Sequence, residues 1–375
     1  MHRLNSIWHP LTATCIIIFL IDHSACPQQG ISELALDKVG ATGLSFQLWK
    51  ADNDKVHQFA IPITFIYPVS EKLRLTMVTS PAASTYESYT TVKLNGFSDS
   101  RFSGTYLFGE DKFMATFGIN IPSGKNTLNI DEFSVANVLA LRALDFQVPI
   151  LGQGLDISAG IVAAKRLGGF VVALGTGYLM RGPFEPIENA VAAYNPGDEI
   201  TISLGIDRAV SRKNKLMFSA NYTIYGEDTI EKTAVFKSGN KISLQGVAYF
   251  PGETMSFLFS AVNRIRRKNK VGSGDLIPER QNSNGNELEI SATGYLKMNL
   301  QTTMRGVFEG KFYSNNAYNV AGASIGGFGA GLSTILTPSL SFDADLIIYA
   351  GTMNTGLEDI NLTGLKIFLG VTVIL

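Results

Sequence analysis

The fold is decided by a ten-residue stretch that reads Lys112-Phe113-Met114-Ala115-Thr116-Phe117-Gly118-Ile119-Asn120-Ile121. One parity of this stretch, from Phe113 to Ile121, is wholly apolar, and the other, from Lys112 to Asn120, is mainly polar. Side chains of a β-strand point alternately to its two faces. A period of two therefore predicts a strand with one apolar and one polar face.

The same alternation recurs along almost the whole chain. About 16 segments of this kind can be drawn, near 43–50, 57–67, 71–79, 97–108, 111–121, 154–165, 169–180, 199–209, 214–225, 241–250, 253–264, 287–298, 301–312, 320–335, 339–350 and 363–375. The total is 14 if 43–50 and 320–335 are left out. Segments of about ten residues have the length of a tilted strand that crosses a bilayer.

The connections between these segments alternate in length. Short ones lie at 68–70, 109–110, 166–168, 210–213, 251–252, 299–300 and 337–338, and longer ones at 80–96, 122–153, 181–198, 226–240, 265–286 and 351–362. Outer-membrane barrels have short periplasmic turns and longer extracellular loops. A soluble β-sandwich or propeller would also alternate in polarity, but its strands are usually five or six residues long. The sequence predicts an all-β protein, a closed antiparallel transmembrane β-barrel of about 14–16 strands.

The N-terminus has the order of a secretory signal. A weakly basic start precedes the apolar run Leu11–Ile21, and small residues follow it. The run is too short for a membrane-spanning helix, which needs roughly 20 residues. We expect 1–26 to be a signal peptide and 27–375 to be a barrel of the bacterial outer membrane, with strands from 41 to 375. The alternatives are an uncleaved N-terminal anchor and lipidation at Cys26.

Charge and histidine content exclude several classes of function. The formal net charge is -1, with no clustered basic face of the kind that nucleic-acid binding needs. Loss of the signal peptide would remove His2, His9 and His23 and leave His57 alone. A Ser-His triad needs a histidine base, and a His/Cys metal site needs several ligands. We therefore expect no enzyme activity, no cofactor and no metal.

The polar parity carries charges of both signs, which we expect to face the lumen because charges at membrane depth need water or a partner. The candidates for a constriction are Arg74, Asp99, Arg101, Arg305, Glu309, Asp343, Asp345 and Lys366. Asp156, Asp207, Arg264, Glu289 and Lys311 share this parity. Such mixed charges either brace the wall with ion pairs or form a constriction for polar solutes. The glycine-rich stretch Gly322–Gly331 lacks the phosphate-loop pattern and predicts a strand at a tight bend or close approach.

The longest predicted loop, 122–153, contains helix formers between Ser134 and Leu144. Helical spacing places Val135, Val138, Leu139 and Arg142 along one stripe. One hypothesis is that this helix folds into or over the outer mouth as an apolar gate. The other is that it only packs on the neighbouring loops.

Two segments resemble a known family of outer-membrane proteins. They are Ile61-Pro62-Ile63-Thr64-Phe65-Ile66-Tyr67 with Glu71-Lys72-Leu73-Arg74-Leu75, and Leu94-Asn95-Gly96-Phe97-Ser98-Asp99-Ser100-Arg101 with Gly118-Ile119-Asn120-Ile121-Pro122-Ser123-Gly124-Lys125. Together they resemble the outer-membrane proteins of the meta-pathway of phenol degradation, which are similar to the long-chain fatty-acid and toluene transporters. The resemblance covers 57–125 and implies diffusion of hydrophobic or aromatic compounds.

These observations lead to one main functional expectation and two alternatives. The main one is passive transport of small hydrophobic or aromatic molecules through the lumen of a barrel embedded in outer-membrane lipid. The alternatives are a structural or assembly barrel that binds a protein partner, and a general porin for polar solutes. Either one subunit or three would suit the pattern, and so would an open or a plugged lumen.

Overall fold

The computed structural model describes residues 37–110, 112–188, 193–209 and 214–375. The expected signal peptide, 1–26, with Cys26, and the expected turn at 210–213 lie outside the described residues. The elements in chain order are β1 (Val39–Ala51), β2 (Asp54–Ala60), β3 (Ile63–Pro68), β4 (Leu73–Thr79), β5 (Pro81–Glu87), β6 (Thr91–Phe97), β7 (Ser100–Phe108), β8 (Phe113–Ile121), α2 (Ile130–Leu139), β9 (Asp156–Leu167), β10 (Phe170–Met180), β11 (Tyr194–Asn195), β12 (Glu199–Ala209), β13 (Lys215–Tyr225), β14 (Asp228–Ile230), β15 (Thr233–Lys237), β16 (Lys241–Phe250), β17 (Met255–Arg266), β18 (Lys270–Ser273), β19 (Asp275–Pro278), β20 (Glu287–Lys297), β21 (Thr302–Tyr313), β22 (Ala323–Thr337), β23 (Leu340–Asn354) and β24 (Asp359–Ile374).

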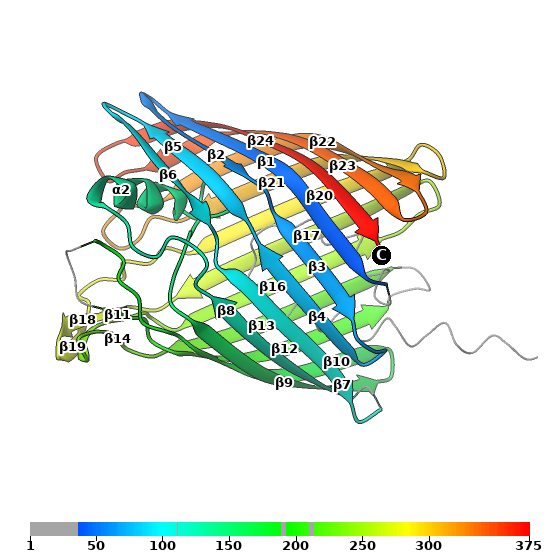
Figure 1. Cartoon of the computed structure of the whole chain (residues 1–375), viewed down its shortest axis with the longest axis horizontal. Coiled ribbons are helices and arrows are strands. Elements are labelled where there is room, and N and C mark those ends of the chain that lie inside the picture. The colour runs from blue at the N-terminus through cyan, green and yellow to red at the C-terminus, as the bar shows by residue number, and fades with distance from the viewer. Residues whose placement is uncertain (1–36, 111, 189–192, 210–213) are drawn as a thin grey trace, which may run out of the picture.

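The strands form a closed antiparallel barrel of 16 wall strands, which confirms the predicted fold and the higher of the two strand counts (Figure 1). Closure is made by the first and last strands. β1 pairs with β24 from Val39 opposite Ile374 to Ala51 opposite Leu362. All the wall pairings are antiparallel, and the sheet has no free edge at its ends. The long connections lie at one end of the barrel, here called the loop end, and the C-terminus lies at the turn end (Figure 1).

Three of the wall strands are each broken into two pieces, which are β2 with β3, β4 with β5, and β6 with β7. A proline stands at two of the breaks, Pro62 within one and Pro81 as the first residue of β5, and neither can donate a backbone hydrogen bond. Backbone bonds bridge the breaks from strand to strand, from Ile61 N to Pro81 O and from Ser98 N to Ser80 O. The breaks therefore form one row across the wall, and the pieces on the loop-end side, β2, β5 and β6, pair with one another beyond it.

The prediction of a long loop at 80–96 is wrong. This segment is the hairpin of β5 and β6, with a tight turn at 88–90. The sequence of this hairpin does not alternate clearly between apolar and polar residues, because its lumen-facing positions include small or polar side chains such as Ser84 and Gly96. Only the packing of the next loop against this hairpin makes those positions a buried face.

The two faces of the wall differ as bilayer physics requires. Large apolar side chains point outward and stay exposed, as at Phe117, Leu174, Phe328 and Ile348. Cations lie over outward aromatic rings close to the turn end, such as Arg208 over Phe170 at 4.8 Å. Polar side chains take the alternate, lumen-facing positions. Hydrocarbon outside and water inside are the only surroundings in which this alternation is favourable.

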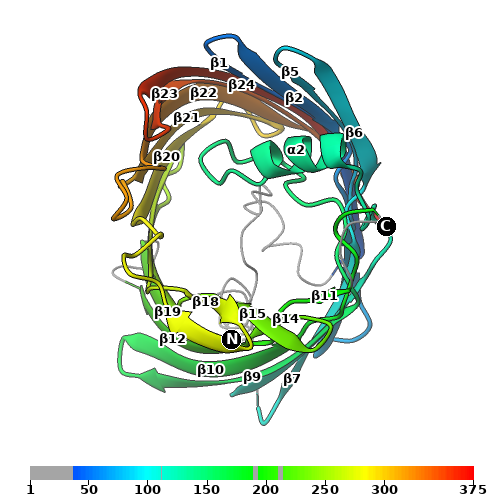
Figure 2. The same cartoon turned by 90° about the vertical axis from the view of Figure 1, so that its left-hand side faces the viewer.

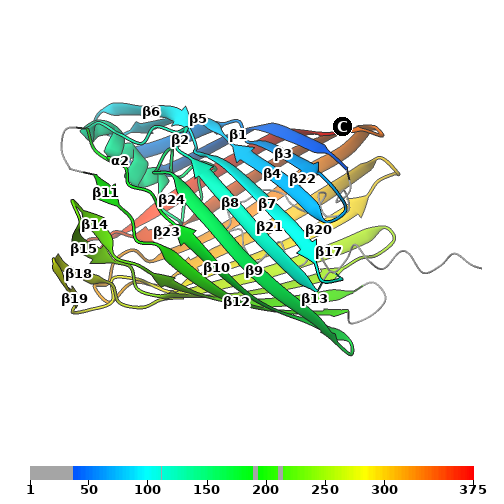
Figure 3. The same ribbon diagram turned by 60° about the horizontal axis from the view of Figure 1, so that its bottom comes forward.

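The long connections at the loop end have structure of their own. Three of them supply β11, β14, β15, β18 and β19, which form a separate five-stranded sheet beyond the barrel wall (Figures 1 and 3). The connection between β8 and β9 behaves differently. It folds back inside the ring of strands, and α2 lies there against β5 and β6 (Figure 2).

The helix α2 begins earlier than the sequence pattern suggested. It starts after Asn129, whose side chain accepts a hydrogen bond from Glu132 N, while the Glu132 side chain accepts one from Asn129 N. This reciprocal capping box satisfies two donors that a helix start would otherwise leave unpaired. The helix ends at Leu139, so the segment 140–155 continues without helical structure.

Glycines on two wall strands make room for large lumen-facing side chains of the strands beside them. A Cβ on Gly364 of β24 would lie 2.7 Å from the Trp49 ring, and one on Gly327 of β22 would lie 2.5 Å from the Tyr349 ring. The two rings lie 5.2 Å apart. The predicted close approach at 322–331 is thus an approach of side chains that lie flat over the glycine backbone.

We predict that Gly364→Ala lowers the free energy of unfolding by about 1–3 kcal/mol, because the new methyl overpacks the Trp49 ring. The matched control is Gly306→Ala, where a Cβ meets nothing within 4 Å. Urea unfolding of the barrel in lipid, followed by tryptophan fluorescence, measures both. Equal midpoints for the two variants would contradict the packing described here.

Candidate functional site

The candidate site is the outer part of the lumen, where the connection between β8 and β9 folds inward. Asp99, between β6 and β7, holds both ends of this connection. Its carboxylate accepts hydrogen bonds from Gly124 N at 3.1 Å and from Gln153 N at 2.8 Å. Gln153 also accepts a hydrogen bond from Arg181, which pairs with Glu199 at 3.2 Å. The connection therefore enters and leaves the lumen at one fixed point on the wall.

Within the lumen, the connection forms an apolar cluster with the wall. On its own side the cluster contains Val135 and Leu139 of α2, then Leu144, Phe146 and Val148, all at most 3% exposed. On the wall side the buried members come from seven strands and include Trp49, Val56, Leu94, Ile325, Ile347, Tyr349 and Leu362. Burial of one large apolar side chain contributes about 1.5–3 kcal/mol. The three residues 144, 146 and 148 alone thus give the segment a stable seat.

Neutral hydrogen bonds fix the register of this seat. Leu144 O accepts from Gln47 Nε2 at 2.5 Å and from Trp49 Nε1 at 2.8 Å. The Gln58 amide donates to Val148 O and accepts from Val148 N, both at 3.0 Å. All of these partners are buried, and each such bond adds about 0.5–1.5 kcal/mol. We call Leu144, Phe146, Val148 and their wall partners Gln47, Trp49 and Gln58 the seat.

A second set of contacts attaches the same segment to a different part of the wall. Arg142 Nη1 lies 2.8 Å from Glu287 Oε2 of β20, and Asp145 Oδ2 lies 3.2 Å from Lys311 Nζ of β21. Tyr313 OH donates to Arg142 O at 3.4 Å. These contacts are charged and partly open to water, since the Arg142 and Asp145 side chains are 41% and 36% exposed. An ion pair as exposed as Arg142 with Glu287 contributes about 0–1 kcal/mol. The pair of Asp145 with Lys311 is less open to water, because the Lys311 side chain is 8% exposed.

The Asp145 carboxylate remains ionised in this setting. Burial inside the barrel opposes its charge, but Lys311, Lys366 and Arg264 outweigh that effect and hold the pKa of Asp145 below its ordinary value. Its backbone has a positive φ of 52°. Asp and Asn tolerate this left-handed conformation better than most residues. The aspartate thus suits both the turn and the ion pair.

Nearer the turn end, the structure brings three of the predicted constriction residues together. Arg305 Nε donates to Asp345 Oδ1 at 2.5 Å, and Arg305 Nη1 lies 3.3 Å from Asp343 Oδ1. The partners sit on β21 and β23 and meet across Gly331 of β22, where a Cβ would lie 2.0 Å from Asp345 Oδ1. The mixed charges here brace three neighbouring strands.

The other predicted site residues lie apart from this cluster. Glu309 accepts a hydrogen bond from Tyr349 OH at 2.7 Å, and Lys366 is level with Gln47 on the neighbouring strand. Arg74 and Arg101 sit on β4 and β7, and Asp99 serves the base of the inward connection. Val138 packs beside the apolar cluster, while Arg142 lies beyond the end of α2. The predicted stripe is therefore split between the apolar cluster and the charged attachment.

Sequence reasoning missed the residues that hold the connection. Gln47 and Gln58 take lumen-facing positions of β1 and β2, as other polar residues such as Ser45 do, so nothing in the sequence set them apart. Glu287 falls at the first residue of its strand, and Asp145 lies in a segment without periodicity. No local pattern links either residue to its partner across 145 or more positions of sequence.

The lumen wall from β12 to β20 has a different character. Hydroxyl groups face one another there, as in Ser260 with Ser291 at 2.8 Å and Thr201 with Thr223 at 3.3 Å. The lumen thus has an apolar region beneath the inward connection and a hydroxyl-rich surface on another part of the wall.

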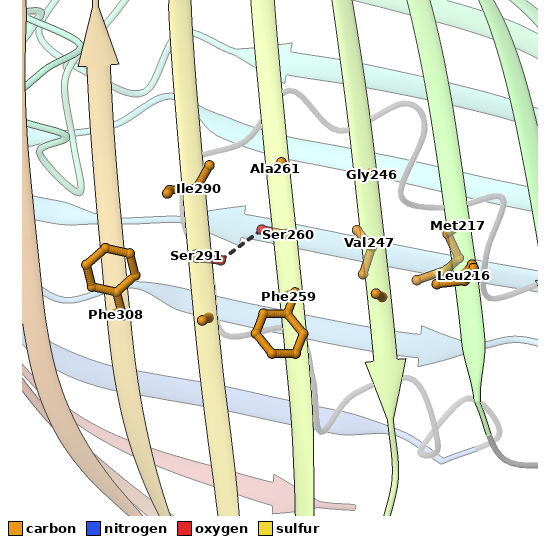
Figure 4. Close-up of a pocket in the computed structure, with 12 residues that line it drawn as sticks. Leu216, Met217, Gly246, Val247, Phe259, Ser260, Ala261, Ile290, Ser291 and Phe308 are labelled. Atoms are coloured by element: carbon orange, nitrogen blue, oxygen red, sulfur yellow. Dashed lines mark hydrogen bonds between the residues drawn. The ribbon is translucent and has the colours of Figure 1, made fainter.

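One hollow of about 610 Å³ lies on this same part of the wall (Figure 4). Leu216, Ala248, Phe259, Ala292 and Phe308 are paired in register across five strands and share one face. Leu216 and Phe259 are among the outward, exposed apolar side chains. These residues therefore face the surrounding lipid, away from the lumen.

The histidine within the described part of the chain does not face the lumen. His57 lies on β2 beside Phe46 and Phe59, with its Nδ1 3.7 Å from Glu87 Oε1. Its neighbours Val56 and Gln58 are the lumen-facing residues of that strand. In the described part of the chain, no group of three or more His, Cys, Asp or Glu residues is placed to hold a metal ion. Nor does any described helix have the length and apolarity to cross a membrane.

No family model matches the chain, and no curated protein matches its sequence. Among solved structures, CdiB from Acinetobacter baumannii has 10% identity, covers 88% of this chain and gives a TM-score of 0.51; this chain spans 60% of CdiB. The CymD monoaromatic hydrocarbon channel has 12% identity over 94% of both chains and a TM-score of 0.48. The TodX monoaromatic hydrocarbon channel deltaS2 mutant has 7% identity over 90% of both chains and a TM-score of 0.49. At these identities the likeness shows the barrel fold alone.

A closed barrel with an apolar outer face and a polar lumen is the architecture of the bacterial outer membrane. The short turns then face the periplasm, and the loop end faces outward. The resemblance seen in residues 57–125 agrees with this location.

We predict that Arg305→Met lowers the free energy of unfolding by about 1–3 kcal/mol, between the values for exposed and buried ion pairs. The variant leaves Asp343 and Asp345 with no guanidinium between them, so adding Asp345→Asn should recover part of the loss. Lys112→Met is the control, because its pair with Glu110 is largely exposed. If urea midpoints show no recovery in the double variant, the pair does not brace the wall.

Proposed function

We propose that this barrel lets small hydrophobic or aromatic molecules pass passively across the outer membrane, along the apolar region of its outer lumen. The observation that carries the proposal is the inward connection. Its apolar side chains pack against Trp49, Tyr349, Ile325 and Ile347 of the wall, all at most 7% exposed, so the outer lumen holds an apolar body in an otherwise polar interior. A route for polar solutes alone has no use for such a lining.

The chemistry of the lining supports this class of solute. The Trp49 and Tyr349 rings pack close to the backbone of Gly364 and Gly327 and are 2% and 3% exposed beneath the inward connection, so a solute meets them where that connection moves aside. Ring faces and branched aliphatic groups attract apolar and aromatic molecules without fixing their orientation. Such a surface suits passage, which needs weak and repeated contacts.

The charges of the lumen support the same reading. They are present in opposite signs and are paired with each other, as in Arg305 with Asp345 and Arg264 with Glu289 at 2.7 Å. A selective pore for ions presents a ring of one sign. Paired charges leave little net field for an ion to follow.

A general porin for polar solutes is the second candidate. The hydroxyl-rich surface from β12 to β20, with Ser260, Ser291 and Thr223, favours it because water and sugars bind such groups. Single-channel recording separates the two candidates: large, steady conductance would favour the porin. Low conductance together with uptake of a hydrophobic solute into lipid vesicles, and none of a sugar of similar size, would favour our proposal.

We predict that removing the inward connection raises conductance severalfold, because it occupies the outer lumen. Replacing 127–149 by two glycines fits the structure, since Gly124 and Lys125 lie beside Leu151 and Gly152. Asp99 then keeps its contacts with Gly124 and Gln153, and the wall keeps all its strands.

The measurement is single-channel conductance in planar bilayers, after heat-modifiable migration on gels has shown that the variant is a folded barrel. The control is an exchange of Ser314–Gly322, another connection at the loop end, for a short glycine linker. Unchanged conductance in the first variant would contradict a role for the inward connection as a gate.

A further inference from the structure

We propose that the inward connection is a two-sided gate, fixed at its seat and released at an electrostatic latch formed by Arg142 with Glu287 and Asp145 with Lys311. The inference rests on the proposed passage through the lumen and adds how that passage is controlled. The latch joins the segment 140–145 to β20 and β21, while the seat joins it to β1 and β2.

The two attachments differ in strength for physical reasons. The seat is neutral, apolar and closed to water, with Leu144 and Val148 at most 3% exposed. The latch consists of ion pairs that water reaches from the side of the connection, where Arg142 and Asp145 are 41% and 36% exposed, although the Lys311 side chain on the wall is 8% exposed. Salt weakens solvent-exposed ion pairs, increasingly so as the Debye length falls from about 8 Å at physiological ionic strength to about 3 Å at about 1 M, but it leaves buried neutral contacts unaffected. The latch is therefore the side that opens first.

The two wall residues of the latch, Glu287 and Lys311, each have another contact that remains when the latch is open. Glu287 also lies 3.6 Å from Arg264 Nη1, so it keeps a cationic partner when Arg142 leaves. Lys311 Nζ lies 5.6 Å from the centre of the Tyr349 ring and keeps that cation–π contact without Asp145. Release consequently leaves no isolated charge on the lumen wall, which would otherwise oppose opening.

On the side of the connection, the residues next to the latch are also free to move when it opens. Residues 140–142, between the end of α2 and the seat, are exposed. Their backbone contacts are local, such as Leu141 N to Val138 O at 3.1 Å. Once the latch opens, this short stretch can leave β20 while Leu144, Phe146 and Val148 stay in place. The Asp145 side chain, between Leu144 and Phe146, turns away from Lys311 without a shift of its backbone. The opening would lie between residues 140–142 and β20.

The test variant is Arg142→Met with Asp145→Asn. It changes only the connection, leaves the net charge of the lumen unaltered, and keeps a residue that accepts the positive φ at position 145. The matched control is Lys55→Met with Glu87→Gln, an ion pair of 3.0 Å between β2 and β5 that does not touch the connection. It removes the same charges from the molecule.

Hydrogen–deuterium exchange in lipid nanodiscs reads the latch directly, over peptides that cover 138–147. In the wild type, exchange should rise when salt is raised from about 0.01 M to about 1 M, because the Debye length falls from about 30 Å to about 3 Å. In the test variant, exchange should be about threefold to tenfold faster at low salt and insensitive to salt. The control should behave as the wild type does.

Single-channel conductance separates the latch from the channel function. Faster exchange with higher conductance supports both. Faster exchange with unchanged conductance supports the latch and rejects the proposed passage through the outer lumen. Unchanged exchange overturns the latch whatever the conductance does, because a change in conductance alone would then reflect only the loss of two lumen charges.

Discussion

The structure depends on one constraint: every backbone hydrogen-bonding group at membrane depth must find a partner within the protein. An unpaired amide in hydrocarbon costs several kcal/mol, so a sheet in a membrane has to close on itself. The pairing of β1 with β24 along their whole length meets this demand. Closure also creates an interior, and whatever the protein does must be done with the residues that face it.

The same constraint explains which parts of the fold were predictable. A closed sheet fixes alternation, so segments such as 112–121 and 339–348 revealed their strands, and the higher of the two predicted strand counts, 16, is the observed one. The hairpin of β5 and β6 escaped because its buried face is made by another part of the chain. Ser84 is hidden under the inward connection, a partner that no local pattern announces.

The candidate site was predictable only in part, and for a related reason. Charged residues at lumen-facing positions could be named, and Arg305, Asp343 and Asp345 do meet. Their meeting depends on Gly331, which lets two side chains cross a strand between them. The contacts of the inward connection depend on how a segment without periodicity folds back, as with Asp145 and Lys311. Alternation carries information about the wall and none about what enters the lumen.

Placing a segment inside a closed barrel has an energetic consequence that a soluble protein would not face. The wall cannot give way, since displacing a strand would break its ladder of hydrogen bonds in lipid. Any change in the lumen must therefore come from the segment itself. Apolar burial at Leu144 and Val148 holds it firmly on one side, and ion pairs whose Arg142 and Asp145 side chains water reaches hold it more weakly on the other. Because the wall is rigid and the inward connection is held more strongly at its seat than at its latch, the lumen can open only on the side of the latch.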